Sequence, residues 1–171
     1  MERANVITIK GKPLTLLGRE LKVGDRAPEF TLLDNSLSAV KLSDSRGKAR
    51  LLSVVPSLDM DVCSIQTRTF NNKAAELSER AAFYTISADL PYAQSRFTRA
   101  HKIDRVQTLS DYRDNSFGNE YGLLIKELRL LARAVLVVDK DDRITHLQIV
   151  PDVATEPNYT AALKALKEAV G

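Results

Sequence analysis

The chain has 171 residues, 44% of them hydrophobic, which is enough to bury the core of one domain spanning residues 1–171. Its 25 Lys and Arg against 22 Asp and Glu leave a net charge of only +3, and no basic run points to nucleic acid. No stretch approaches the length of a membrane span, and the N-terminus lacks the apolar segment of a signal peptide. We therefore expect a cytoplasmic protein. The single cysteine excludes an intramolecular disulfide and cysteine-rich metal sites, so neither a metal nor a cofactor is expected.

Strand-like and helix-like patterns alternate along the chain. Residues 6–9 and 14–17 flank a turn that contains Gly11, which predicts a β-hairpin within residues 1–18. Later strands are expected at residues 30–33, 40–42, 51–55, 82–87, 106–109, 134–138 and 144–150. Helices are expected at about residues 62–77, 91–101, 114–121 and from 156 onwards, with a polar loop at 43–48. This alternation predicts an α/β fold with a mixed sheet covered on both faces.

The only cysteine follows a predicted buried strand. Pro56 has no N–H to donate to a sheet, so the strand should stop there, and a helix should begin near residue 62. Asp59 and Asp61 are candidate caps for that helix. Cys63 then lies in the first turn, where free N–H groups and the helix dipole favour a thiolate, so we expect a depressed pKa. The alternative is that Cys63 is a small buried hydrophobic residue.

Several segments resemble one protein family. Pro56 and Cys63 stand at the spacing of the peroxiredoxin signature. The chain is further similar to bacterial thiol peroxidases, the atypical two-cysteine branch of that family, at residues 87–97, 131–135 and 156–159. The similarity runs in order over nearly the whole chain. It implies a thioredoxin-like fold with an N-terminal hairpin, reduction of hydroperoxides, thioredoxin or another thiol as reductant, and a homodimer.

Arg133 is the candidate positive partner of the thiolate. It stands between the apolar residues 130–132 and the predicted strand 134–138, where a charge is costly unless a partner meets it. The resemblance places a catalytic arginine here; the alternative is a structural salt bridge at a strand end. Pro56 would shield the thiolate while also ending its strand. The backbone N–H groups of Val62 and Cys63 are candidates to bind the peroxide, as free donors at a helix start.

Two positions depart from the family pattern. Met60 stands where peroxiredoxins carry a Thr that both donates and accepts hydrogen bonds, and a thioether has no donor. Thr98 stands where thiol peroxidases carry the resolving cysteine, after Ser95-Arg96-Phe97. An oxidised Cys63 would then need an outside thiol, or it would overoxidise. The sequence thus predicts a peroxide site with a missing donor and no internal resolving thiol.

Three hypotheses follow from the sequence. The first is a one-cysteine thiol peroxidase, impaired by Met60 and Thr98. The second is a catalytically degenerate thioredoxin-fold protein that senses redox state or binds a partner through Cys63, and the third is a structural protein with an inert cysteine. The candidates for an apolar dimer face are Tyr92, Tyr112 and Phe117, each of which could instead pack in the core.

Overall fold

The computed structural model describes residues 1–77 and 79–171. Its centre is a seven-stranded sheet with the strand order β10-β9-β5-β6-β7-β3-β4. Strands β5, β6 and β7 run parallel, whereas the remaining neighbours are antiparallel. The strands are β3 (Thr31–Leu33), β4 (Ala39–Lys41), β5 (Ala49–Val54), β6 (Ala81–Ser87), β7 (Gln107–Ser110), β9 (Ala134–Val138) and β10 (Ile144–Ile149).

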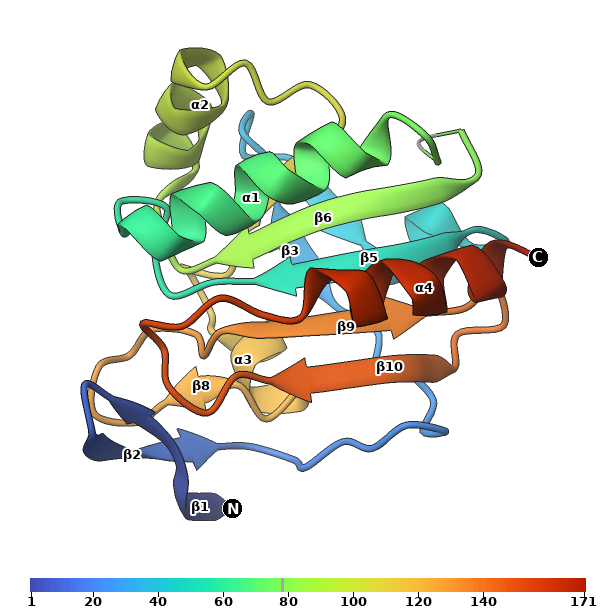
Figure 1. Ribbon diagram of the computed structural model, residues 1–171. Coiled ribbons are helices and arrows are strands. Elements are labelled where there is room, and N and C mark those ends of the chain that lie inside the picture. The colour runs from blue at the N-terminus through green and yellow to red at the C-terminus, as the bar shows by residue number, and fades with distance from the viewer. Residues whose placement is uncertain (78) are drawn as a thin grey trace.

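Helices cover both faces of this sheet because successive strand residues point to opposite sides. Leu51 of β5 packs in the apolar layer under α1 (Asp61–Ala74) and α4 (Tyr159–Val170), which lie side by side on the near face in Figure 1. Leu52 points the other way, into the larger layer that contains Phe117 of α3 (Ser116–Glu120). The remaining helix, α2 (Pro91–Ala100), follows β6 in the chain. The sheet is therefore mixed and covered on both faces, as the alternation of elements predicts.

A second, smaller sheet contains the N-terminal hairpin. Its strands are β1 (Glu2–Ile9), β2 (Lys12–Leu17) and β8 (Leu124–Ile125), in that order. The turn residues Lys10 and Gly11 both have positive φ angles, 48° and 81°, as a two-residue hairpin turn requires. The hairpin lies where the sequence predicts it, but β8 was not predicted, because two residues carry no readable periodicity.

Several predicted boundaries and caps need correction. Met60 is the N-cap of α1 and offers no side-chain hydrogen bond, so neither Asp59 nor Asp61 caps this helix. Leu90 is the N-cap of α2, again without a side-chain bond. The predicted loop at residues 43–48 is partly a 3-10 helix, η1 (Leu42–Ser45). Three predicted helices are shorter than expected: α1 ends at Ala74, α3 has five residues, and α4 begins at residue 159 behind an Asn158 cap.

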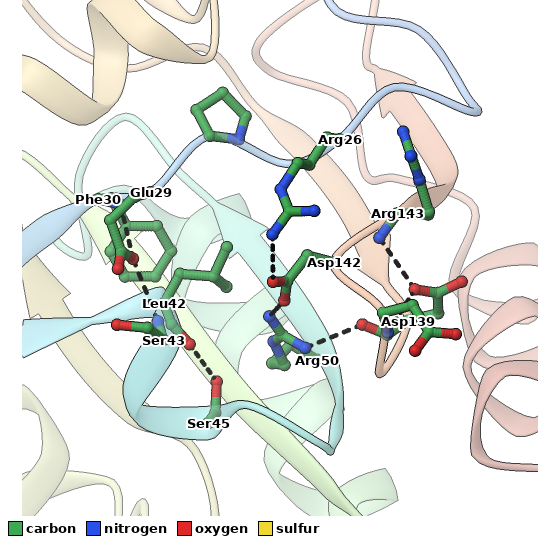
Figure 2. Close-up of polar contacts among 12 residues, drawn as sticks. Arg26, Glu29, Phe30, Leu42, Ser43, Ser45, Arg50, Asp139, Asp142 and Arg143 are labelled. Atoms are coloured by element: carbon green, nitrogen blue, oxygen red, sulfur yellow. Dashed lines mark hydrogen bonds and ion pairs between the residues drawn. The ribbon is translucent and has the colours of Figure 1, made fainter.

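A fully buried arginine anchors the start of β5 (Figure 2). Arg50 donates to the carbonyl oxygens of Lys48 at 2.7 Å and Asp139 at 2.8 Å, and it forms an ion pair with Asp142. Arg26 reaches the same carboxylate at 3.4 Å. This group ties β5 to the turn between β9 and β10, at the end of β5 that is opposite to Cys63.

Candidate active site

Cys63 lies at the carboxyl end of the central strand β5, in the first turn of α1. Its side chain is fully buried and packs in a small apolar cluster with Val55, Leu58 and Phe97. Met60 and Ile103, both partly buried, pack against this cluster. The thiol is therefore covered by the loop that precedes α1 and by one residue of α2.

Arg133 meets the thiol directly. It is fully buried just before β9, which pairs with β5 through Val54 and Ala134, and its Nη2 atom lies 3.2 Å from the Sγ atom of Cys63. Its Nη1 atom donates to Oε1 of Gln66 at 3.0 Å. Its Nε and Nη2 atoms both donate to the carbonyl oxygen of Val153, at 2.9 and 2.7 Å. Within residues 1–77 and 79–171, no carboxylate forms an ion pair with Arg133, so a structural salt bridge is not its role there.

Gln66 is a site residue that sequence reasoning missed. It is fully buried, accepts from Arg133 as above, and donates from Nε2 to Oγ of Ser53 at 2.8 Å. A signal was present, because residues three apart share one face of a helix and Gln66 follows Cys63 at that spacing. A polar amide on the buried face needs a partner, and the partner here is the arginine.

The pKa of Cys63 differs from the depressed value that the sequence predicts. Burial raises the pKa of Cys63 above its ordinary value, and it outweighs the lowering by a backbone hydrogen bond with Ser57 and by the nearby Arg133 charge. The predicted depression of the pKa is therefore wrong for this buried thiol. The helix start does not compensate for the loss of solvent around the sulfur.

The other predicted site residues are only partly brought together. Pro56 is buried directly after β5, while Met60 and Val62 are half-buried at the start of α1. Thr98 follows Phe97 on α2, and its hydroxyl donates to the carbonyl oxygen of Ser95 at 2.9 Å. Thr98 is not a member of the cluster around Cys63; it lines a separate polar cavity of about 350 Å³.

Two absences concern the described residues only. They contain no group of three or more His, Cys, Asp and Glu side chains that could hold a metal ion. Of the helices in this part of the chain, none is both long enough and apolar enough to cross a lipid bilayer.

Comparisons with known proteins match nearly the whole chain. The family model described as Redoxin matches residues 22–163. The thiol peroxidase of Bacillus subtilis (strain 168) is 51% identical over 164 residues, which are 96% of this chain and 98% of that protein. The thiol peroxidase of Staphylococcus aureus (strain MRSA252) is 50% identical over 161 residues, 94% of this chain and 97% of that one. A solved peroxiredoxin-like protein from Aquifex aeolicus has a TM-score of 0.91 at 37% identity, covering 98% of this chain and 97% of its own.

Fold and site together define the class. A mixed sheet whose central strand leads into a helix with a cysteine in its first turn is a thioredoxin-like fold carrying a thiol site, as expected from the sequence. The chain belongs to the Redoxin family, and within it to the thiol peroxidases. This membership makes the protein a thiol-dependent peroxidase of the peroxiredoxin type.

Proposed function

We propose that this protein reduces hydroperoxides through Cys63 alone, with Arg133 as the catalytic cation. The observation that carries the proposal is the 3.2 Å contact between Nη2 of Arg133 and Sγ of Cys63, both fully buried. A guanidinium at this distance, away from water, favours the thiolate and faces the place where charge develops on a departing oxygen. Gln66 and Val153 hold that guanidinium in place.

The first chemical step transfers one oxygen atom. The Cys63 thiolate attacks the terminal oxygen of a hydroperoxide, the O–O bond breaks, and the second oxygen leaves with the bonding pair. Uptake of a proton by that oxygen releases an alcohol or water, and Cys63 becomes a sulfenic acid. In this proposal Arg133 stabilises the negative charge before and during this step.

Met60 makes this step slow. The family's Thr would supply a hydroxyl at the N-cap of α1, whereas Met60 supplies no hydrogen bond there. The N–H groups of Val62 and Cys63 are the donors that this helix start retains for the peroxide. Loss of one positioned donor costs about 10²- to 10³-fold in rate, so we expect a weakened enzyme.

An outside thiol completes the cycle, because the chain holds no second cysteine. A thiol reductant attacks the sulfenic acid, water leaves, and a mixed disulfide with Cys63 forms; a second thiol then releases Cys63 and carries away the disulfide. Thioredoxin or a comparable thiol is the proposed reductant. A cytoplasmic location stays a prediction.

A homodimer is also proposed, and its face needs one correction. Phe117 is fully buried in the core and is not available for a dimer contact. Tyr92 is 67% exposed near the start of α2, and Leu90, two residues before it, is 51% exposed. These exposed apolar side chains support a contact at the start of α2. Sedimentation of wild type against Tyr92→Glu tests it: the variant should be monomeric at concentrations where wild type is dimeric.

One experiment tests the peroxidase proposal. Reduced protein is mixed with one equivalent of hydroperoxide, and the mass of Cys63 is followed after trapping of the sulfenic acid. We expect an increase of one oxygen at Cys63 and turnover when a thiol is added. Oxidation without turnover would instead favour the redox-sensing role. An unmodified Cys63 would exclude both.

A further inference from the structure

The carboxylate of Asp89 lies between two loops at the carboxyl ends of β5 and β6. Its Oδ1 atom accepts from the hydroxyl of Ser57 at 2.8 Å. Its Oδ2 atom accepts from the backbone N–H of Leu58 at 2.8 Å and from the hydroxyl of Ser87 at 2.7 Å. Asp89 precedes Leu90, the N-cap of α2, and its side chain bonds to the loop before α1 rather than to α2.

Hydrogen bonds from β7 and α2 fix the position of Asp89 in turn. Its carbonyl oxygen accepts from the hydroxyl of Ser110 at 2.5 Å. The buried amide of Gln94 donates to Oγ of Ser87 at 3.0 Å and to the carbonyl oxygen of Leu109 at 2.9 Å. These bonds connect Asp89 to the ends of β6 and β7, so its carboxylate is a fixed point against which a neighbouring loop can be placed.

The loop that Asp89 holds is the one that contacts the thiol. Leu58 packs against Cys63 in the buried cluster around the thiol. The adjacent Ser57 backbone, like Arg133, opposes the rise in the pKa of Cys63. The same short turn is closed by the N–H of Asp59 on Oγ of Ser57 at 3.2 Å and by the N–H of Met60 on the Ser57 carbonyl at 3.0 Å. A change in this turn therefore changes a group that stabilises the thiolate.

We propose that Asp89 is a positioning residue for peroxide reduction, which holds the turn at Ser57 and Leu58 against Cys63. The inference rests on the proposed function of Cys63 as the reacting thiol. Asp89 acts through the turn and does not touch the sulfur in any described contact. A displacement of about 1 Å at a reacting centre can cost about 100-fold in rate, so a fixed turn matters for the reaction.

The negative charge of Asp89 and its hydrogen bonds have opposite effects on the pKa of Cys63, and substitutions can separate the two effects. Through space, its negative charge raises the pKa of Cys63. Asp89→Asn keeps an oxygen that can accept from Leu58 and loses the charge, so it should lower the pKa of Cys63 and keep the turn. Asp89→Ala loses both, and because the Ser57 bond outweighs the Asp89 charge, the pKa of Cys63 should rise.

The test compares wild type, Asp89→Ala, Asp89→Asn and Asp139→Ala. Asp139 is the matched control, because its carboxylate also holds a loop, at the end of β9 away from Cys63. It accepts from the N–H groups of Asp141 and Arg143, both at 2.9 Å. Each variant is measured for single-turnover oxidation of Cys63 by hydroperoxide, for alkylation of Cys63 by iodoacetamide against pH, and for thermal unfolding.

We expect Asp89→Ala to oxidise about 10- to 100-fold more slowly than wild type, with a raised alkylation midpoint. Asp89→Asn should oxidise within about threefold of wild type, with a lowered midpoint, since a retained hydrogen bond preserves geometry. Asp139→Ala should lose thermal stability only. If Asp89→Ala matches wild type in oxidation and in midpoint, or if Asp89→Asn is as slow as Asp89→Ala, the positioning role is overturned.

Two further measurements cover the cases in which Asp89→Ala does not fold or wild type does not react. If Asp89→Ala does not fold, Ser57→Ala removes one of the same hydrogen bonds, and a wild-type oxidation rate in that variant overturns the proposal. If wild-type Cys63 is not oxidised by hydroperoxide, the proposed function fails. In that case the alkylation midpoints of Asp89→Ala and Asp89→Asn still show whether the held turn stabilises the thiolate.

Discussion

The guanidinium of Arg133 donates twice to the carbonyl oxygen of Val153, from Nε at 2.9 Å and from Nη2 at 2.7 Å. Val153 is in turn held by the N-terminal hairpin, because its N–H donates to the carbonyl oxygen of Thr8 at 3.0 Å. The hydroxyl of Thr8 also donates to Oδ2 of the neighbouring Asp152 at 2.8 Å. The hairpin outside the main sheet thus helps to hold the arginine that faces Cys63.

Replacing Arg133 with Met should slow oxidation of Cys63 by about 100-fold or more, since a positioned cation facing the developing charge is lost. The alkylation midpoint of Cys63 should rise for the same reason. Stability should fall by roughly 1–3 kcal/mol per acceptor left unpaired, here at Val153 and Gln66. Stopped-flow oxidation, alkylation against pH and urea unfolding measure the three effects.

Arg50→Met is the control for that substitution, because Arg50 is equally buried but lies at the far end of β5. It should destabilise the protein and leave the oxidation rate of the folded molecules unchanged. Equal rates for Arg133→Met and wild type would mean that Arg133 is structural only.

Met60→Thr should act at the N-cap of α1. Without peroxide bound, a Thr hydroxyl can accept from a free N–H group of the first turn, which should raise the free energy of unfolding by about 1 kcal/mol. If the missing hydroxyl donor limits the rate, the substitution should also lower the barrier to the first oxidation of Cys63 by roughly two to four kcal/mol and so speed that step. Met60→Ala is the control that opens the same space without a hydroxyl. A single-turnover rate that does not move in Met60→Thr, or that rises equally in Met60→Ala, contradicts the missing-donor explanation.

Thr98→Cys should leave the first oxidation nearly unchanged, because a resolving thiol reacts only after the sulfenic acid forms. It should restore turnover with thioredoxin through an internal disulfide between Cys63 and the new thiol. Since Thr98 lies outside the cluster around Cys63, local unfolding of α1 or α2 must bring the sulfurs together. Mass spectrometry of the oxidised protein and steady-state peroxide reduction check this, with Thr98→Ser as the thiol-free control. A persistent free thiol after oxidation would show that the two helices do not open.

The stability of the protein should depend on pH through Asp111. Burial raises its pKa to about 6 from an ordinary value of 3.8, against the lowering by the N–H groups of Gly118 and Phe117. Below about pH 4 the carboxyl is protonated in the folded and unfolded states alike, so its contribution to stability is fully present. Between about pH 4 and pH 6 the unfolded state is ionised while the folded state still binds the proton, so roughly 3 kcal/mol of that contribution is lost by the time pH passes 6.

Urea unfolding of wild type and Asp111→Asn at pH 4 to 7 measures this effect, because the difference between the two proteins removes the other titrating groups. The free energy of unfolding of wild type should fall relative to the variant as pH rises. A difference that stays flat across this range would show that Asp111 is not a buried titrating group.

Local sequence patterns were sufficient to place Pro56 at the end of a strand and Cys63 at the start of a helix. Pro56 ends a strand because proline has no backbone N–H to donate, and Cys63 follows at the start of a helix whose pattern is readable within one turn. Arg133 stood out because a charge between apolar residues needs a partner. The strand end, the helix start and the partnered charge agree with the structure, because each was read from residues close together in the chain.

Other features depend on segments far apart in the chain, and they required the tertiary structure. Gln66 meets Arg133 across 67 positions, and the Asp89 side chain meets Leu58 across 31, so neither contact has a local pattern. The pKa of Cys63 was predicted with the wrong sign for a related reason. A helix start is visible in the sequence, but the desolvation that outweighs it comes from Val55, Leu58 and Phe97 closing over the sulfur in the folded chain.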